Sequence, residues 1–200
     1  MGLLHRLANL GAWPAARAPL VRGDKIYLRG AEARDYTAWA TLREKSRSFL
    51  EPWEPVWSAN DLTRENFRRR LQRQRDDVSA GTAYPFLIFR IHDQALVGGA
   101  TLSNVRRGVV QSCSLGYWVG AAYARQGYTS DAVRALSRFV FKDLGLHRLE
   151  AACVPTNEPS KALLRKCGFT EEGYARDYLK INGIWADHVL FALLTTDKRP

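Results

Sequence analysis

The segment over residues 115–130, LGYWVGAAYARQGYTS, places the strongest constraint on how this chain folds. An apolar, strand-like run ends in a glycine-containing loop, and the loop leads directly into an amphipathic helix. Because apolar residues recur after it at helical spacing, residues 125–130 should form the first turn of that helix. The apolar positions are Val133, Leu136, Val140 and Leu144.

The start of this helix is a predicted anion site. The first backbone N–H groups of a helix have no intrahelical partner, and the macrodipole favours negative charge there. Gly127 lets a phosphate approach the backbone closely. The chain contains neither GxxxxGK[ST] nor GxGxxG, which excludes a Walker loop and a dinucleotide fingerprint. We expect a different phosphate-bearing ligand, held at Arg125, Gln126, Gly127, Tyr128, Thr129 and Ser130.

Length and composition favour a single globular domain. The chain has 200 residues, is 46% hydrophobic, and contains no linker-like tract that divides it. Residues 1–23 contain three arginines and no acid, but they lack the Ser and Thr typical of a transit peptide. No apolar run is long enough for a membrane span. We therefore expect a loosely ordered extension over residues 1–23 and one domain over residues 24–197.

The three cysteines, Cys113, Cys153 and Cys167, lie in strand-like or helical segments. They form no CxxC pair, and the four scattered histidines show no metal-ligand spacing, so no metal site is predicted. Buried free thiols in a reducing cytosol are the preferred interpretation. A nucleophilic cysteine is the alternative.

Hydrophobic periodicity predicts an α+β domain in which antiparallel strands come first and a strand–helix–strand crossover follows. A hairpin should join the two apolar runs on either side of residues 92–94. Strands are expected over residues 25–28, 86–91, 96–102, 111–119, 149–154, 169–175 and 188–194. Helices are expected over residues 32–46, 63–78, 130–144 and 159–166.

Several short motifs occur in a characteristic order along the chain. They are FLEPWEP at residues 49–55, LSNV with RG at 102–108, LGY at 115–117, LHR at 146–148, Asn157 with Ser160, GF with EGYA at 168–175, and Trp185 with DHVL at 187–190. Because these motifs occur in this order, the chain resembles the RimJ-type ribosomal-protein-alanine N-acetyltransferases of the Gcn5-related N-acetyltransferase (GNAT) superfamily. The resemblance covers about residues 25–197.

The resemblance implies the GNAT fold, a mixed and mostly antiparallel sheet of six or seven strands with helices on both faces. It also implies acetyl-CoA as co-substrate and a protein N-terminus as acceptor, in bacteria that of a small-subunit ribosomal protein starting with Ala. The pyrophosphate loop of the superfamily, Q/R-x-x-G-x-G/A, falls on residues 124–129. Here Gly127 matches, whereas Ala124 and Thr129 depart from the pattern.

The same resemblance suggests how the thioester is held. In the superfamily, the strand that ends at residues 117–119 splays from its neighbour, so that the backbone of Trp118 and Val119 pairs with pantetheine amides. A free N–H there can also face the thioester oxygen. Ser160, in the family's N-x-x-S element, is the expected donor to the departing thiolate. Asn157 is also a good helix N-cap, with Pro159 in the first turn.

The acceptor amine needs only modest base catalysis, because a free α-amino group titrates near 7.7 to 8.0. Carboxylates acting through water are the candidates: Glu51 and Glu54 in the PWEP segment, and Asp187 on a late strand. Glu54 is ranked first, and Asp187 beside His188 is equally explained as a structural pair. The base of RimL-type relatives falls on Leu179, so their mechanism does not transfer directly.

A formal charge of +10 suits an anionic co-substrate and also an enzyme that meets ribosomal RNA through a basic surface. Arginines crowd residues 64–75, with Phe67, Leu71 and Val78 as the expected inner stripe, and a solvated helix face explains them as well. Two further functions stay open: acetylation of a small amine, and a non-catalytic ribosome- or RNA-binding role. A cytoplasmic location without membrane attachment is expected.

Overall fold

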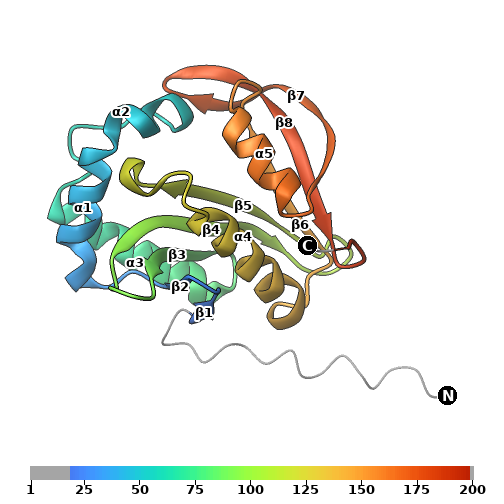
Figure 1. The fold of residues 1–200 in the computed structure, drawn as a ribbon, viewed down its shortest axis with the longest axis horizontal. Coiled ribbons are helices and arrows are strands. Elements are labelled where there is room, and N and C mark those ends of the chain that lie inside the picture. The colour runs from blue at the N-terminus through green and yellow to red at the C-terminus, as the bar shows by residue number, and fades with distance from the viewer. Residues whose placement is uncertain (1–18, 199–200) are drawn as a thin grey trace.

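The computed structural model describes residues 19–198, which form one eight-stranded sheet between helices on both faces (Figure 1). The strand order is β1-β2-β3-β4-β5-β6-β8-β7. Neighbouring strands are antiparallel except β5 and β6, which are parallel. The strands are β1 (Val21–Arg22), β2 (Ile26–Arg29), β3 (Tyr84–Arg90), β4 (Leu96–Arg106), β5 (Ser112–Val119), β6 (Arg148–Cys153), β7 (Thr170–Ile181) and β8 (Ile184–Leu194).

Two hydrophobic cores lie on opposite faces of the sheet. Side chains alternate along a strand, and in β3 this places Phe86 and Ile88 in one core and Leu87 and Phe89 in the other. The first core includes α4 and α5, and the second includes α1 and α3. The helices are α1 (Tyr36–Lys45), α2 (Arg47–Leu50), α3 (Arg64–Ala80), α4 (Tyr128–Arg138) and α5 (Glu158–Lys166).

The predicted α+β architecture with a mostly antiparallel sheet is confirmed, including the hairpin of β3 and β4 and the crossover from β5 through α4 to β6. The sheet has eight strands where six or seven were expected, because Val21–Arg22 pairs with β2 as an additional edge strand. The last two strands are longer than expected. They run on to a shared turn at Asn182 and Gly183, and bulges interrupt their pairing.

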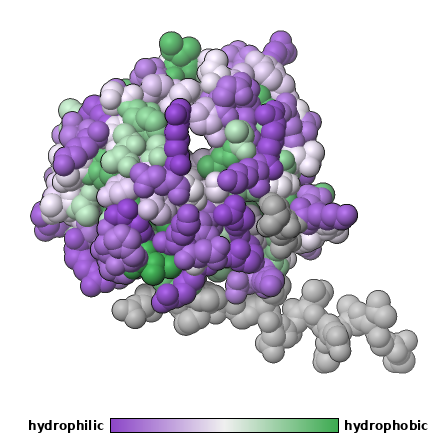
Figure 2. All heavy atoms as spheres, viewed as in Figure 1, coloured by the Kyte–Doolittle hydropathy of each residue, from purple (hydrophilic) through white to green (hydrophobic). Residues whose placement is uncertain are grey.

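Residues 1–18 of the predicted N-terminal extension lie outside the described residues. In the part of the chain that is described, no helix is long and apolar enough to cross a membrane. The surface on the α4 side is largely hydrophilic (Figure 2).

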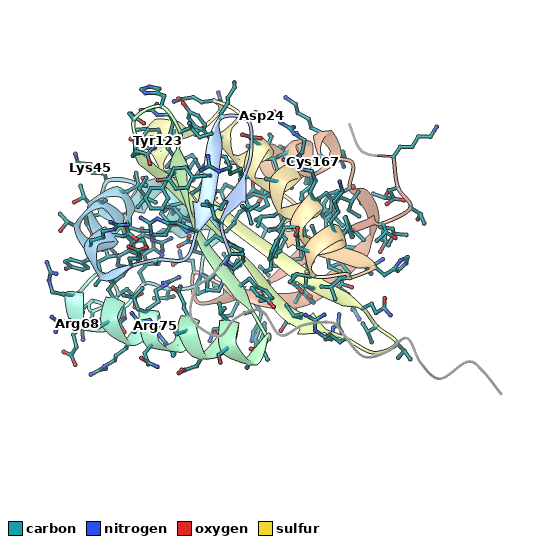
Figure 3. All side chains as sticks on the ribbon, turned by 90° about the horizontal axis from the view of Figure 1, so that it is seen from below. Asp24, Lys45, Arg68, Arg75, Tyr123 and Cys167 are labelled. Carbon is teal, nitrogen blue, oxygen red and sulfur yellow. The ribbon has the colours of Figure 1, made fainter. Side chains whose placement is uncertain are left out.

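The arginine-rich helix α3 packs on the sheet as predicted. Phe67 and Leu71 are buried, and Val78 is half-buried against the core. Arg68 and Arg75 are exposed and point away from the protein (Figure 3). Other arginines of this helix lie against the protein, since the guanidinium of Arg64 is 4.4 Å from the Tyr36 ring and that of Arg70 is 5.6 Å from the Trp39 ring.

Candidate active site

The parallel strands β5 and β6 separate shortly after they meet. They pair only from Ser112 to Ser114, opposite β6 residues 148–150. On its other side β5 stays paired with β4 as far as Val119. Residues 116–119 of β5 therefore present a backbone edge toward the gap, without a β6 partner in the described chain. Unpaired backbone groups at such an edge can bind an extended ligand that carries amides.

The helix start predicted as an anion site opens onto free space. Helix α4 begins at Tyr128, and Gly127 precedes it as the N-cap with φ +85°. A Cβ placed on Gly127 would meet no protein atom within 4 Å. Residues 125–127 are exposed, Tyr128 and Thr129 are half-buried, and Ser130 is buried. The geometry fits an anion held by backbone N–H groups, with little room for a side chain on Gly127 once the anion is present.

Distant residues hold this loop in place. Ala121 N–H donates to the hydroxyl of Ser46 at 3.0 Å, at the end of α1. A guanidinium nitrogen of Arg90 donates to the Tyr128 hydroxyl at 3.2 Å, and the same group lies near the ring of Tyr123 (5.5 Å). Ser46 and Arg90 were not among the predicted site residues, because nothing in their local sequence indicates which loop they contact.

On the α5 side of the sheet, the hydroxyl oxygens of Tyr117 and Ser160 lie 2.7 Å apart. Ser160 N–H donates to the side chain of Asn157, so the predicted N-cap is confirmed. Burial raises the pKa of Tyr117, which stays protonated at neutral pH. Ser160 therefore has a hydroxyl partner that can donate a proton to it or accept one from it. From the sequence, Tyr117 was expected only as part of the splayed strand.

The three cysteines are free and buried, as expected. Burial raises the pKa of each thiol, to about 12 for Cys113. A raised pKa disfavours the reactive thiolate, which supports the interpretation as buried thiols.

Trp118 points to the opposite face of β5 from Tyr117 and lies among charged groups. The Arg43 guanidinium lies 4.9 Å from its ring and 4.1 Å from the ring of Trp57. Arg43 donates to both carboxylate oxygens of Glu54, at 2.8 and 2.7 Å, and Trp57 Nε1 also donates to Glu54 at 2.8 Å. Such a bidentate pair fixes the geometry of the carboxylate strongly.

The catalytic role predicted for Glu54 stays a prediction, and the partners of its two oxygens favour positioning over proton transfer. Glu51, the second candidate in this segment, is more exposed and lies 3.5 Å from a guanidinium nitrogen of Arg47. The backbone carbonyl of Glu54 also accepts from Asn182 N–H at 2.8 Å. This bond connects the PWEP segment to the β7–β8 turn, which Figure 1 shows arching toward α2.

Asp187 has structural partners, though not the neighbour considered in the sequence analysis. Its carboxylate accepts from the Tyr174 hydroxyl at 2.6 Å and from Asp177 N–H at 2.8 Å, within the bulge of β7. The Tyr174 hydrogen bond and then the Asp177 one lower the pKa of Asp187. His188 lies near the Tyr178 ring instead, with 5.5 Å between ring centroids. A role for Asp187 as base stays a prediction.

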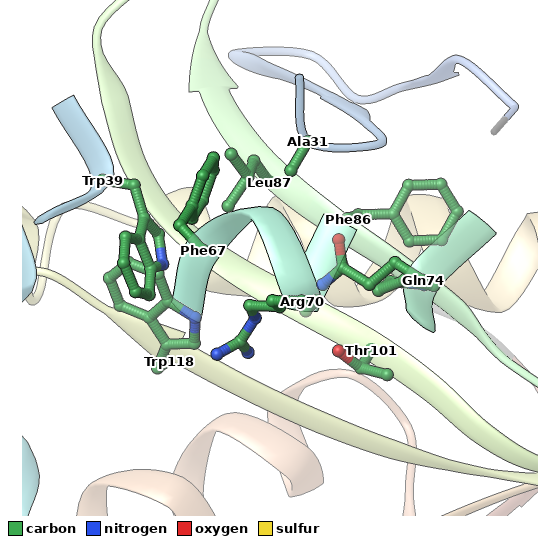
Figure 4. A pocket seen from close by; sticks show the side chains of 11 residues that line it. Ala31, Trp39, Phe67, Arg70, Gln74, Phe86, Leu87, Thr101 and Trp118 are labelled. Carbon is green, nitrogen blue, oxygen red and sulfur yellow. The ribbon is translucent and has the colours of Figure 1, made fainter. Parts of the chain in front are cut away.

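Two hollows lie along the boundary between α3 and the sheet. The smaller one has room for about one water molecule and is bordered by Arg70, Gln74, Thr101 and Trp118 among others (Figure 4). The larger one, of about 610 Å³, is lined chiefly by polar residues of α3 and the sheet and by one aromatic residue of β7. Among them are Asp77, Ser103, Asn104, Ser114 and Tyr178.

Among residues 19–198, no cluster of three or more His, Cys, Asp or Glu side chains is arranged to hold a metal ion.

The sheet splays beside a helix start capped by glycine. The hydroxyl pair of Tyr117 and Ser160 lies on one face of the sheet, and the two hollows along α3 lie on the other. This arrangement is that of the CoA-dependent acyltransferases. Residues 25–170 match the model of the acetyltransferase (GNAT) domain. The chain belongs to this family.

Similar proteins have been described in several bacteria. The chain is 36% identical over 177 residues to the Escherichia coli [ribosomal protein uS5]-alanine N-acetyltransferase, covering 88% of this chain and 91% of that protein. It is 34% identical over 178 residues to the probable N-acetyltransferase YjcK of Bacillus subtilis, covering 89% and 98% respectively. The structure of Mycobacterium smegmatis RimJ in complex with CoA-disulfide superposes with a TM-score of 0.82 at 32% identity, over 88% of this chain and 86% of that one.

Proposed function

We propose that this enzyme transfers acetyl from acetyl-CoA to the α-amine of a protein N-terminus, that of a ribosomal protein starting with Ala. The observation that carries the proposal is the backbone edge at residues 116–119 of β5, which has no β6 partner in the described chain and belongs to the strand that carries Trp118 of the smaller hollow and Ser114 of the larger one. The similarity to the E. coli enzyme that acts on ribosomal protein uS5 supports the choice of acceptor.

Each part of the site has a proposed task. The N–H groups of the loop and first helical turn, from Arg125 to Ser130, bind the pyrophosphate, and the backbone of Trp118 and Val119 binds the pantetheine amides. Acetyl-CoA supplies the acetyl group as a thioester. Ser160, hydrogen-bonded to Tyr117, donates to the sulfur as the thiolate leaves. Asn157 orders the start of α5 around Ser160.

The two hollows along α3 are together the proposed entrance for the acceptor, and they are called the groove. Its larger hollow, about 610 Å³, is lined by residues of α3 and of β4, β5, β6 and β7, and this size suits several residues of a peptide better than a small amine. Trp118, on the groove side of β5, lies next to the Arg43–Glu54 pair. We propose that this pair positions the incoming chain, and that proton removal from a partly neutral α-amine takes place through water.

We further propose that the reaction takes place in the cytoplasm and that the outward arginines of α3 approach ribosomal RNA. The formal charge of +10 and the exposed Arg68 and Arg75 support such an approach. The buried free thiols are compatible with a reducing compartment.

The proposed function is tested by acetyl-CoA consumption with a panel of acceptors. The panel contains peptides with free Ala, Ser or Met N-termini, the same peptides with blocked N-termini, and small amines such as polyamines. Turnover with free Ala peptides and none with the blocked controls is expected. Faster turnover with a small amine than with any peptide would contradict the proposal.

A further inference from the structure

Arg70 carries a positive charge that has no carboxylate partner. It extends from α3, and within residues 19–198 its guanidinium forms no ion pair, although it lies 5.6 Å from the ring of Trp39. Its neighbour Arg43 donates to both oxygens of Glu54 through its two terminal nitrogens, and only its buried Nε lacks a hydrogen-bond partner among the described residues. By contrast, Arg69 on the same helix pairs with Glu65. An exposed arginine left without an ion pair in the wall of a hollow is available to an anion from outside the chain.

Arg70 lies in the wall of the smaller hollow. Figure 4 shows its side chain extending toward Trp118, with Gln74 and Thr101 nearby. The residue is accessible to solvent, yet protein surrounds it on several sides. This surrounding protein, followed by the charges of Arg43 and Arg73, lowers the pKa of Arg70. These two arginine charges favour an anion beside Arg70, while the carboxylates of Glu54 and Asp61 act more weakly in the opposite direction.

The smaller and the larger hollow of the groove follow one another along α3 and β4. Arg70 and Gln74 border the first and Asp77 borders the second, and this spacing places all three on one side of α3. On β4, Thr101 borders the first and Ser103 the second, so both face the same side of the sheet. Seven helical residues span about 10 Å, which matches about three residues of an extended chain.

We propose that Arg70 binds a carboxylate of the acceptor, so that the enzyme prefers protein N-termini with Asp or Glu within about the first four residues. This inference rests on the proposed function, because it assumes that the acceptor chain lies in the groove. A guanidinium presents a planar pair of N–H donors that matches a carboxylate. Arg70 borders the groove together with Trp118, whose strand edge faces the gap, so the recognised carboxylate lies close to the reacting amine.

The test compares matched peptides that start with Ala and differ only in Glu or Gln at position 2, 3 or 4. For the wild-type enzyme, kcat/KM should be about tenfold higher for the best Glu peptide than for its Gln partner, as a single charge-assisted contact allows. Raising the ionic strength should reduce this ratio.

Variants identify the residue responsible. Arg70→Gln should bring the ratio close to one, and Arg70→Glu should shift the preference toward Lys peptides. The matched control is Arg68→Gln, which removes the same charge from an outward position on α3 and should leave the ratio unchanged. Arg70→Lys should keep part of the preference, since charge remains without the planar fork.

The outcomes separate this inference from the proposed function. Peptides that are acetylated with no Glu preference, or with a preference that survives Arg70→Gln, overturn the assignment of Arg70 and leave N-terminal acetylation standing. An equal loss in Arg68→Gln and Arg70→Gln would assign the effect to overall charge and also overturn it. A wild-type enzyme that acetylates no peptide overturns the proposed function, and this inference with it.

Discussion

The hydroxyl groups of Tyr117 and Ser160 form a hydrogen bond of 2.7 Å between β5 and the first turn of α5. The two residues are 43 positions apart in sequence, and the splay of β5 from β6 leaves the edge beside Tyr117 accessible to an extended ligand. The bond connects the strand that is proposed to hold the thioester with the helix that is proposed to supply the proton.

The first prediction concerns Ser160. Ser160→Ala should lower turnover by about ten- to a hundredfold, at or below the usual range for acid catalysis, because a thiolate leaves readily. Affinity for acetyl-CoA should change little. Single-turnover rates and calorimetric titration separate the two effects. Unchanged turnover under conditions where chemistry limits the rate would remove the role of Ser160 as donor.

Two variants act as controls for Ser160. Asn157→Ala should cost about 0.5–2 kcal/mol of stability by removing the cap of α5, with a smaller effect on turnover. Tyr117→Phe retains the ring and removes the hydroxyl, so it should reduce turnover by less than Ser160→Ala does. If it changed only stability, Tyr117 would be a packing residue alone.

The features predicted correctly from the sequence depend on local patterns. The strand, loop and helix around Gly127 follow from an apolar run, a glycine and helical periodicity within one short segment. The cap of Asn157 on Ser160 spans three residues and follows from residue type. Both structures form through contacts between near neighbours, so one sequence suffices to predict them.

The features that were missed depend on contacts between distant residues. The bonds of Ser46 to Ala121 and of Arg43 to Glu54 join segments whose proximity is decided by the tertiary fold. Strand β7 was predicted too short because most of its residues are exposed and give no alternating apolar pattern. The sequence did not indicate that Arg70 borders a hollow while Arg68 points outward, because arginine occupies positions 68, 69, 70 and 73 of α3.

A second prediction tests the anion site at Gly127. Gly127→Val should weaken acetyl-CoA binding severely, because the new side chain would occupy the open space beside the first helical N–H groups. Gly108→Val is the matched control. Gly108 also has a positive φ, +68°, and open space around its Cβ position, but it lies in the β4–β5 turn.

Both glycine variants should lose about 1–3 kcal/mol of stability through backbone strain. Only Gly127→Val should lose affinity in calorimetric titrations with acetyl-CoA. Equal affinities for the two folded variants would place the pyrophosphate elsewhere.

The third prediction concerns Glu54. Glu54→Gln should lower kcat/KM by a similar factor at every pH between about 6 and about 9, a range that brackets the titration of an α-amine. This uniform loss is expected because the carboxylate holds Arg43 between the rings of Trp57 and Trp118. Glu51→Gln removes the same charge from a more exposed pair and should have little effect. A loss confined to low pH would instead identify Glu54 as the base.

The last prediction concerns Asp187 and the dependence of stability on pH. Asp187→Asn should destabilise the protein at neutral pH, because an amide cannot accept hydrogen bonds from both Tyr174 and Asp177 through two oxygens. The pKa of Asp187 is lowered in the folded state, so its contribution is present above the ordinary aspartate value of 3.8. That contribution is lost as the pH falls through the lowered folded-state value. Urea unfolding of both proteins at several pH values should give midpoints that differ at neutral pH and converge in acid.

The same variant separates a structural role from a catalytic one. If Asp187 holds the bulge of β7, turnover of the folded variant should fall by one factor at all pH values. If Asp187 is the base, the loss should shrink at high pH, where the acceptor amine is already neutral. Because both oxygens of the half-buried Asp187 accept hydrogen bonds from β7, we expect the first pattern.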